Sequence, residues 1–236
     1  MLENKRPSYF WMNGETLRFA FEEEISQHNV RRLEQLERFV RERIGKQVVE
    51  CVAGYHTLTV FLRGAVRIDA ALLLDEWEQQ SFEALPLEKR IVRVPVCYDE
   101  EFALDMGRME QETGLCAEDI VRLHSGRMYT VYMMGFLPGF PYLGGLDERL
   151  AVSRLAEPRK HVVAGSVGIG GAQTGVYPID SPGGWNIIGR TPLRLFDAGR
   201  MEPFLFEPND EVRFVPIEKA EFAVLERDGV SGWSLY

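Results

Sequence analysis

The first part of the chain has the hydrophobic spacing of two strands and then of a helix. Residues 9–21 (YFWMNGETLRFAF) contain two β-prone runs on either side of Asn13 and Gly14. This pair tolerates the positive φ angles of a tight hairpin turn. In residues 22–45 the apolar positions recur at helical spacing, with acidic residues at the start and a glycine at the end. The segment therefore predicts a β-hairpin followed by an amphipathic helix.

A second pair of strands and a second helix are predicted next. Residues 48–64 form two apolar runs around Gly54, and residues 68–85 have the composition of a helix. The resulting order, ββαββα, predicts a small N-terminal α/β domain of the α+β class, in which helices cover one face of a mainly antiparallel sheet. Pro86 and a cluster of charged residues end the pattern, so we expect this domain to span residues 1–88.

Residues 89–236 have a different pattern and predict a second domain. Two short helices are expected at 100–114 and 117–126, followed by an aromatic, β-branched strand. Beyond Phe136 helical periodicity is absent, and short apolar runs are separated by Gly, Pro, Asn and Asp. This spacing is typical of an all-β sandwich or barrel.

Composition narrows the classes of function. The 236 residues are 45% hydrophobic and 27% charged, as in a folded globular protein, and the net charge of −9 disfavours general nucleic-acid binding. No stretch has the apolar length of a signal peptide or a membrane span, so we expect no membrane contact and a cytoplasmic location. Cys51, Cys97 and Cys116 lie far apart, which predicts small core residues and neither disulfides nor a zinc site.

The glycine-rich run at residues 165–171 (GSVGIGG) has the composition of a phosphate-binding loop but not its spacing. Gln173 stands where a dinucleotide fingerprint needs Gly or Ala, and no Gly-Lys-Ser/Thr follows. The same run approaches the nucleophile elbow of esterases, but Ala164 replaces the first glycine of that motif. For Ser166 a turn position or a polar contact is therefore favoured over a role as nucleophile.

Basic and histidine side chains offer only one candidate anion site. The four histidines share no metal-ligand spacing, so no metal site is expected. Arg159 is followed by Lys160 and His161 at the predicted start of a strand. These side chains either bind a carboxylate or protect a solvated strand edge, and the sequence leaves both interpretations open.

Two aromatic stretches have the composition of a pocket. Residues 134–145 (MGFLPGFPYLGG) place aromatic rings among glycines and prolines without a single charge. Residues 179–192 (IDSPGGWNIIGRTP) bring Trp185 close to Asn186 and Arg190 along the chain. Trp185 beside paired glycines either fills a gap in the packing or forms the wall of a pocket, where Asn186 and Arg190 would orient a ligand.

Taken together and in order, the motifs of this chain resemble the allophanate hydrolase subunit 1 family. The family includes the sporulation-kinase inhibitor KipI and the B subunit of the bacterial ATP-dependent 5-oxoprolinase. The resemblance covers nearly the whole chain and is dense between residues 91 and 215. It rests on RVPVCYD (93–99), RLHS (122–125), MGFLPGFPYLGGLDERL (134–150), PRKHVVAGSVGIGGAQTGVYPIDSPGGWNIIGRTPLRLFD (158–197) and EPND (207–210).

The resemblance implies a fold and a multi-subunit activity. Residues 89–236 are expected to form a cyclophilin-like β-barrel domain. The family role that we favour is the B subunit of a 5-oxoprolinase, which converts 5-oxo-L-proline to L-glutamate together with the A and C subunits and is inactive alone. The ATP of that reaction is expected on a partner subunit, and no cofactor is expected on this chain.

The resemblance also assigns candidate residues by motif. Arg159 is the expected anion ligand, His124 the expected proton-transfer group, and the run Gly165–Gly171 the expected source of backbone N–H donors. Gln173 and Tyr177 are expected to orient the amide of the substrate. Further substrate contacts are expected from Ser166, Asn186 and Arg190, and a pocket or subunit interface from Phe136, Phe140, Tyr142 and Trp185.

Two other roles share the same scaffold and remain open. A KipI-like chain would inhibit a sporulation sensor histidine kinase by docking its exposed apolar stretch on the kinase. Alternatively, the chain would be subunit 1 of an allophanate hydrolase or of a biotin-dependent carboxyltransferase. It has no Met-Lys-Met biotinylation motif, so any biotin would arrive on a partner.

Overall fold

The computed structural model describes residues 5–65, 67–80, 90–229, 233 and 235. The chain divides into two compact units, Met1–Glu88 and Lys89–Tyr236. The boundary expected near residue 89, with Pro86, lies outside the described residues. No helix in the described part has both the length and the apolar composition needed to cross a membrane.

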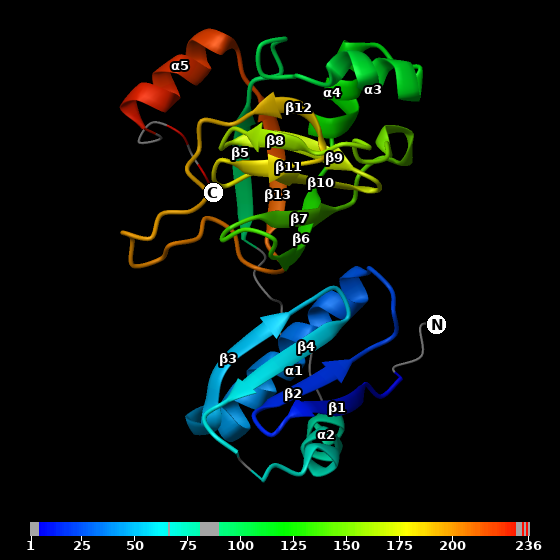
Figure 1. Ribbon diagram of the computed structural model, residues 1–236, viewed down its shortest axis with the longest axis vertical. Coiled ribbons are helices and arrows are strands. Elements are labelled where there is room, and N and C mark those ends of the chain that lie inside the picture. The colour runs from blue at the N-terminus through cyan, green and yellow to red at the C-terminus, as the bar shows by residue number, and fades with distance from the viewer. Residues whose placement is uncertain (1–4, 66, 81–89, 230–232, 234, 236) are drawn as a thin grey trace. The chain divides into compact units, whose positions relative to one another are not determined.

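The first unit is a four-stranded antiparallel sheet with two helices (Figure 1). Its strands have the order β1-β2-β4-β3. Apolar side chains of β2, β3 and β4 form one core with those of the two helices, whereas the side chains of β1 are exposed. The chain order is ββαββα, as predicted, with a short 3₁₀ turn η1 after the first helix. The elements are β1 (Ser8–Asn13), β2 (Thr16–Ala20), α1 (Gln27–Ile44), η1 (Gly45–Gln47), β3 (Val48–Ala53), β4 (Thr57–Leu62) and α2 (Ala70–Gln79).

Helix α1 begins later than the hydrophobic pattern predicts. The acidic residues expected in its first turn precede the helix, because Ser26 is the N-cap and its hydroxyl accepts a hydrogen bond from the Asn29 amide. Asn29, the one polar residue in the apolar stripe, is buried. Its side-chain amide donates to the carbonyls of Glu22 and Glu24, so it fastens the preceding segment to the helix.

The second unit contains a seven-stranded sheet, a separate two-stranded ribbon and three α-helices among the described residues. The first elements are β5 (Ile91–Val96), α3 (Met106–Thr113), α4 (Ala117–Ser125), β6 (Tyr129–Met134), β7 (Pro141–Gly144) and the 3₁₀ turn η2 (Glu148–Leu150). They are followed by β8 (Arg159–Val162), β9 (Ser166–Gly170), β10 (Gln173–Val176), β11 (Ser181–Gly183), β12 (Asn186–Arg190), β13 (Glu211–Pro216) and α5 (Lys219–Asp228).

The large sheet curls into a barrel. Its strand order is β12-β9-β10-β7-β6-β13-β5, and all pairs are antiparallel except β13 with β5. The two edge strands meet through one bridge, in which Cys97 and Arg190 exchange backbone hydrogen bonds of 2.9 Å. Apolar side chains such as Val94, Val167 and Phe214 fill the core. The expected α+β class and barrel are therefore confirmed.

Helix α5 is an element that the hydrophobic pattern does not predict, since no helical periodicity is visible beyond Phe136. Only two of its ten residues, Phe222 and Leu225, are buried. Phe222 packs against Phe102 with ring centroids 4.5 Å apart. So short an apolar stripe gives little periodic signal.

The prediction that the cysteines are core residues holds for only one of the three. Cys97 is fully buried, Cys51 is partly buried, and Cys116 is exposed at the N-terminal cap of α4.

Candidate functional site

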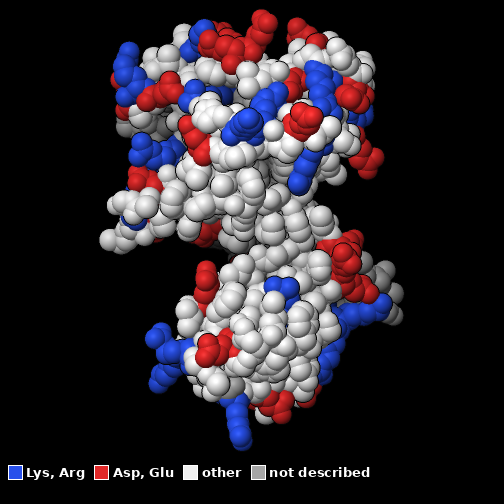
Figure 2. Space-filling view, viewed as in Figure 1, with Lys and Arg blue, Asp and Glu red and all other residues white. Residues whose placement is uncertain are grey.

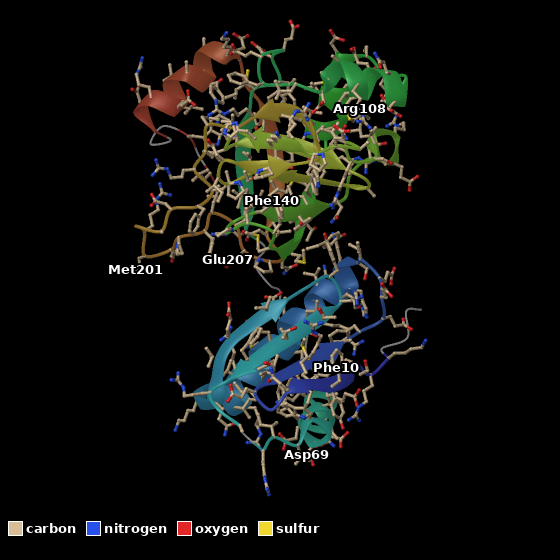
Figure 3. The ribbon with its side chains drawn as sticks, in the orientation of Figure 1. Phe10, Asp69, Arg108, Phe140, Met201 and Glu207 are labelled. Carbon is tan, nitrogen blue, oxygen red and sulfur yellow. The ribbon has the colours of Figure 1, made fainter. Side chains whose placement is uncertain are left out.

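A cavity of about 290 Å³, called the aromatic cavity below, opens on the second unit, and five of its eleven lining residues are aromatic. All four residues predicted to form a pocket or interface line it. Figure 2 shows an uncharged band over β6 and β7, and Figure 3 labels Phe140, which immediately precedes β7, in the same view. The lining residues are Phe136, Phe140, Tyr142, Arg154, Leu155, Pro158, Tyr177, Pro182, Gly183, Gly184 and Trp185.

The loop between β6 and β7 presents Phe136 at the cavity mouth. The loop folds onto itself, because the Gly135 amide donates to the Phe140 carbonyl at 3.1 Å and the Phe140 amide donates to the Leu137 carbonyl at 3.1 Å. Phe136 has a φ of 66°, a left-handed conformation that costs a non-glycine residue about 1–3 kcal/mol. Its side chain is nevertheless 63% exposed, so core packing does not explain the strain.

Phe140 is the centre of the aromatic wall and is only 1% exposed. Its ring meets those of Phe136, Tyr177 and Trp185 edge to face, with centroid distances of 5.8, 5.2 and 5.4 Å. Tyr142 joins the same group, 5.0 Å from Phe140 and 5.8 Å from Trp185. Edge-to-face contacts of this kind stabilise the arrangement beyond simple burial, so the wall is preorganised.

Trp185 lies on a surface made by glycines of β9 and β10. A Cβ atom at Gly170 would lie 2.7 Å from the indole Nε1, and one at Gly175 would lie 3.0 Å from Cζ3 of the same ring. Gly168 approaches the Trp185 Cβ in the same way, at 3.1 Å. Two glycines of the run GSVGIGG, Gly168 and Gly170, are therefore needed because Trp185 packs directly on their backbone, whereas Gly165 and Gly171 have positive φ angles.

This packing differs from the donor loop expected at residues 165–171. Residues 166–170 are strand β9, which pairs with both β10 and β12. The Gly165 amide donates to the Tyr177 carbonyl at 2.7 Å and the Ser166 amide to the Val163 carbonyl at 3.1 Å. Ser166 itself is buried. The backbone hydrogen bonds of this run thus serve the barrel, which argues against the expected donor role.

Arg159, the expected anion ligand, is held by an internal carboxylate. Its Nη2 lies 2.5 Å from Oδ1 of the buried Asp105. The other oxygen of Asp105 accepts the Ile187 amide at 2.6 Å, so the carboxylate ties α3 and β8 to β12. This pair neutralises the charge of Arg159 through Nη2, whereas Nη1 of the same guanidinium is buried without a hydrogen-bond partner among the described residues.

His124, the expected proton-transfer group, is a core residue with no exposed surface. Its Nδ1 lies 2.8 Å from the Tyr98 hydroxyl and its Nε2 lies 2.9 Å from Oγ1 of Thr174. Because the Thr174 hydroxyl donates to the Gly168 carbonyl, it accepts from Nε2–H, and Nδ1 accepts from Tyr98.

The ring of His124 also stacks on Phe214 with a centroid distance of 4.5 Å. Burial lowers the pKa of His124 to about 3, so the ring is neutral. The position argues against proton transfer to a substrate and for a role in joining α4 to the barrel.

The remaining predicted residues lie apart from the aromatic cavity. Asn186 is fully buried and donates to the carbonyls of Ser153 and Ile169. Gln173 lies at the start of β10, opposite Gly170. Arg190 lines a second cavity of about 350 Å³, where it contacts the Ala164 carbonyl at 3.1 Å and Glu226 at 3.2 Å. The structure therefore brings together the aromatic residues and Tyr177, but not the predicted polar set.

Tyr177 and Arg154 supply polar groups to the cavity. Burial raises the pKa of the Tyr177 hydroxyl, which a backbone hydrogen bond from Trp185 and nearby cations partly offset, so the hydroxyl stays protonated. Arg154 places its guanidinium carbon 5.6 Å from the Trp185 ring centroid. No motif in the sequence singles out Arg154. Arg154 lies 31 positions before Trp185 in the chain, so its contact with the tryptophan could not be predicted from local sequence.

A metal centre finds no support in the described part of the chain. There, no group of three or more His, Cys, Asp or Glu side chains is arranged to hold a metal ion.

Known proteins place the chain in a family. Residues 7–206 match the family described as carboxyltransferase domain, subdomain C and D. The B subunit of 5-oxoprolinase from Escherichia coli O157:H7 is 49% identical over 171 residues, which cover 72% of this chain and 78% of that protein.

Solved structures show the same architecture. TTHA0988 superposes with a TM-score of 0.75 at 32% identity over 86% of this chain, which spans 40% of that protein. The Kluyveromyces lactis urea amidolyase matches with a TM-score of 0.72 at 21% identity, over 94% of this chain and 15% of the amidolyase, and so shares the fold. The chain therefore belongs to the carboxyltransferase domain, subdomain C and D family, and its aromatic cavity lies within the residues that define the match.

Proposed function

We propose that this chain is the B subunit of an ATP-dependent 5-oxoprolinase, which converts 5-oxo-L-proline to L-glutamate together with the A and C subunits. The observation that carries the proposal is the 49% identity to the Escherichia coli protein named as the B subunit of 5-oxoprolinase, over most of both chains. The aromatic cavity supports it, since about 290 Å³ lies at the small end of the range for ligand pockets and suits a small ring.

The cavity supplies binding surface rather than reactive groups. Its described lining contains no Ser, Cys, Lys, His, Asp or Glu. Burial raises the pKa of both lining tyrosines, Tyr142 and Tyr177, so neither is an activated nucleophile or general base. Phe136 and Tyr142, the more exposed rings of the lining, suit the face of a five-membered lactam. The protonated Tyr177 hydroxyl is a hydrogen-bond donor. In this proposal the groups that activate the lactam come from the partner subunits, and the isolated chain is inactive.

We assign the ATP to a partner subunit. The one glycine-rich run of this chain that has the composition of a phosphate loop is strand β9, which is paired on both sides. An anion-binding loop instead needs unpaired backbone N–H groups that point at the phosphate.

The test is reconstitution with defined components. The chain is expressed with candidate A and C subunits, the complex is purified through a tag on one partner, and glutamate release from 5-oxo-L-proline is measured with and without ATP. We expect release only with all three subunits and ATP. A stoichiometric complex that binds ATP but releases no glutamate would refute the proposal.

A further inference from the structure

The aromatic cavity contains a single ionic side chain. Among the described residues that line it, Arg154 alone carries a charge at neutral pH, and the others are aromatic, aliphatic, proline or glycine. The guanidinium lies over the Trp185 ring at 5.6 Å, which fixes its position at the wall by a cation–π contact. A cation is thus held at the edge of an otherwise uncharged pocket.

Arg154 differs from the neighbouring arginines in having no carboxylate. Arg159 is paired with Asp105 and Arg190 with Glu226. In the described ranges 5–80, apart from residue 66, and 90–229, no acidic side chain pairs with Arg154. Stacking on an indole satisfies the face of a guanidinium but leaves its N–H edge able to bind a planar anion.

The same features disfavour a cationic ligand. Aromatic cages that bind ammonium groups use ring faces in the absence of competing positive charge. Here Arg154 supplies positive charge, and the described lining contains no acid to offset it. A ligand with a carboxylate and a neutral flat ring therefore fits, whereas one with an additional ammonium group is repelled.

We propose that Arg154, and not Arg159, binds the carboxylate of the substrate, and that the aromatic cavity thereby distinguishes a lactam acid from an amino acid. The inference rests on the proposed function for the identity of the lactam. 5-Oxo-L-proline has a carboxylate and an uncharged ring nitrogen, so both parts match the cavity. L-Glutamate and L-proline carry an ammonium group, so the cavity takes up the substrate and releases the product.

The experiment compares variants in the assembled complex. Arg154→Gln and Arg154→Lys are tested beside Arg227→Gln, which removes an exposed arginine of α5 that does not line the cavity. For Arg154→Gln we expect the KM for 5-oxo-L-proline to rise about ten- to hundredfold with a much smaller change in kcat, because a charge-assisted contact to a non-reacting group is lost. The lysine variant should recover part of the loss, and Arg227→Gln should match the wild type.

Two analogues test the recognition itself. 2-Pyrrolidinone has the lactam ring without the carboxylate, so its turnover should be weak in the wild type and unchanged in Arg154→Gln. L-Proline should inhibit the wild type poorly, because its ammonium group meets the charge of Arg154. An unchanged KM in Arg154→Gln, or strong inhibition of the wild type by L-proline, would overturn the inference.

Other outcomes separate this inference from the proposed function. If the wild-type complex releases glutamate but only Arg159→Gln raises the KM at an unchanged Tm, then Arg159 is the anion ligand and the inference fails alone. If Arg154→Gln weakens co-purification while the KM of the remaining complex is normal, the carboxylate belongs to a partner subunit and the inference also fails. If the wild-type complex is inactive, the proposed function fails. Calorimetric binding of 5-oxo-L-proline to the full chain, present in the wild type and lost in Arg154→Gln, would then still support the role of Arg154, and equal binding would refute it.

Discussion

The buried imidazole of His124 predicts a defined loss of stability in acid. Burial lowers its pKa to about 3 in the folded chain, against an ordinary value of 6.5. The folded state keeps the ring neutral, so below pH 6.5 the unfolded state alone binds a proton. The contribution of this group is complete above pH 6.5 and is lost as the pH falls toward 3. Between pH 7 and pH 5 the free energy of unfolding should fall by about 2 kcal/mol from this group, at about 1.4 kcal/mol per pH unit below 6.5.

The assay isolates this group by comparison with His124→Gln. Glutamine can donate to Thr174 and accept from Tyr98 but does not titrate. Urea unfolding is followed by tryptophan fluorescence with Trp11 and Trp77 replaced by Phe, so that the remaining tryptophans, Trp185 and Trp233, report on the second unit. All other carboxylates and histidines are common to both proteins, and their pH dependence cancels in the difference.

The two proteins should differ in how their stability depends on pH. The wild type should lose about 2 kcal/mol more than His124→Gln between pH 7 and pH 5, with little difference in slope above pH 7. Parallel curves would mean that the ring is protonated, or accessible to water, in the folded state. The assignment of donors and acceptors from Tyr98 through His124 and Thr174 to the Gly168 carbonyl would then be wrong.

Three further substitutions test the site and its supports. Gly170→Ala places a methyl group 2.7 Å from the Trp185 indole, so the free energy of unfolding in urea should fall by about 1–3 kcal/mol and the KM should rise. Its control, Gly107→Ala in α3, has open space around it and should be neutral or stabilising. Asp105→Ala leaves Arg159 and the Ile187 amide unpaired, so the free energy of unfolding should fall by about 3 kcal/mol. Asp105→Asn keeps an acceptor for the amide and should lose less stability, and equal losses in the two variants would show that the amide contact is unimportant. Phe136→Gly relieves backbone strain of about 1 kcal/mol and loses a ring contact with Phe140 of similar energy, so the Tm should hardly change while the KM rises. A large fall in Tm would show that the ring serves packing instead.

Local patterns predict the elements and the aromatic wall well, because both depend on short-range chemistry. The Asn13-Gly14 turn, the stripe of α1 and the mixture of rings, glycines and prolines at 134–145 are encoded by neighbouring residues. The order ββαββα follows from where those elements begin and end. Helix α5 escapes detection because its buried face consists of two residues.

The roles of the polar residues could not be derived in the same way, because they depend on partners far along the chain. The sequence around Arg159 predicts an anion ligand, but in the folded chain Arg159 pairs with Asp105, which lies 54 residues earlier. His124 has the appearance of a catalytic residue until Thr174, 50 residues later, is found on its second nitrogen. The glycines of β9 resemble a phosphate loop in sequence, but in the structure they provide the surface on which Trp185 packs. Such pairings are set by the register of strands and not by local spacing.

The parallel pairing of β5 with β13 has a consequence for biosynthesis. These strands are the first and last of the barrel sheet in the chain, and Arg90 and Asp210, which form an ion pair beside them, are 120 residues apart. While the ribosome is still translating the intervening residues, β5 has no partner on that side, and pairing over so long a separation is slow to form. The barrel is therefore completed only after residues 211–216 have been synthesised. Fragments released before residue 211 would leave a hydrophobic strand edge exposed, which makes premature termination in this part of the gene an aggregation hazard.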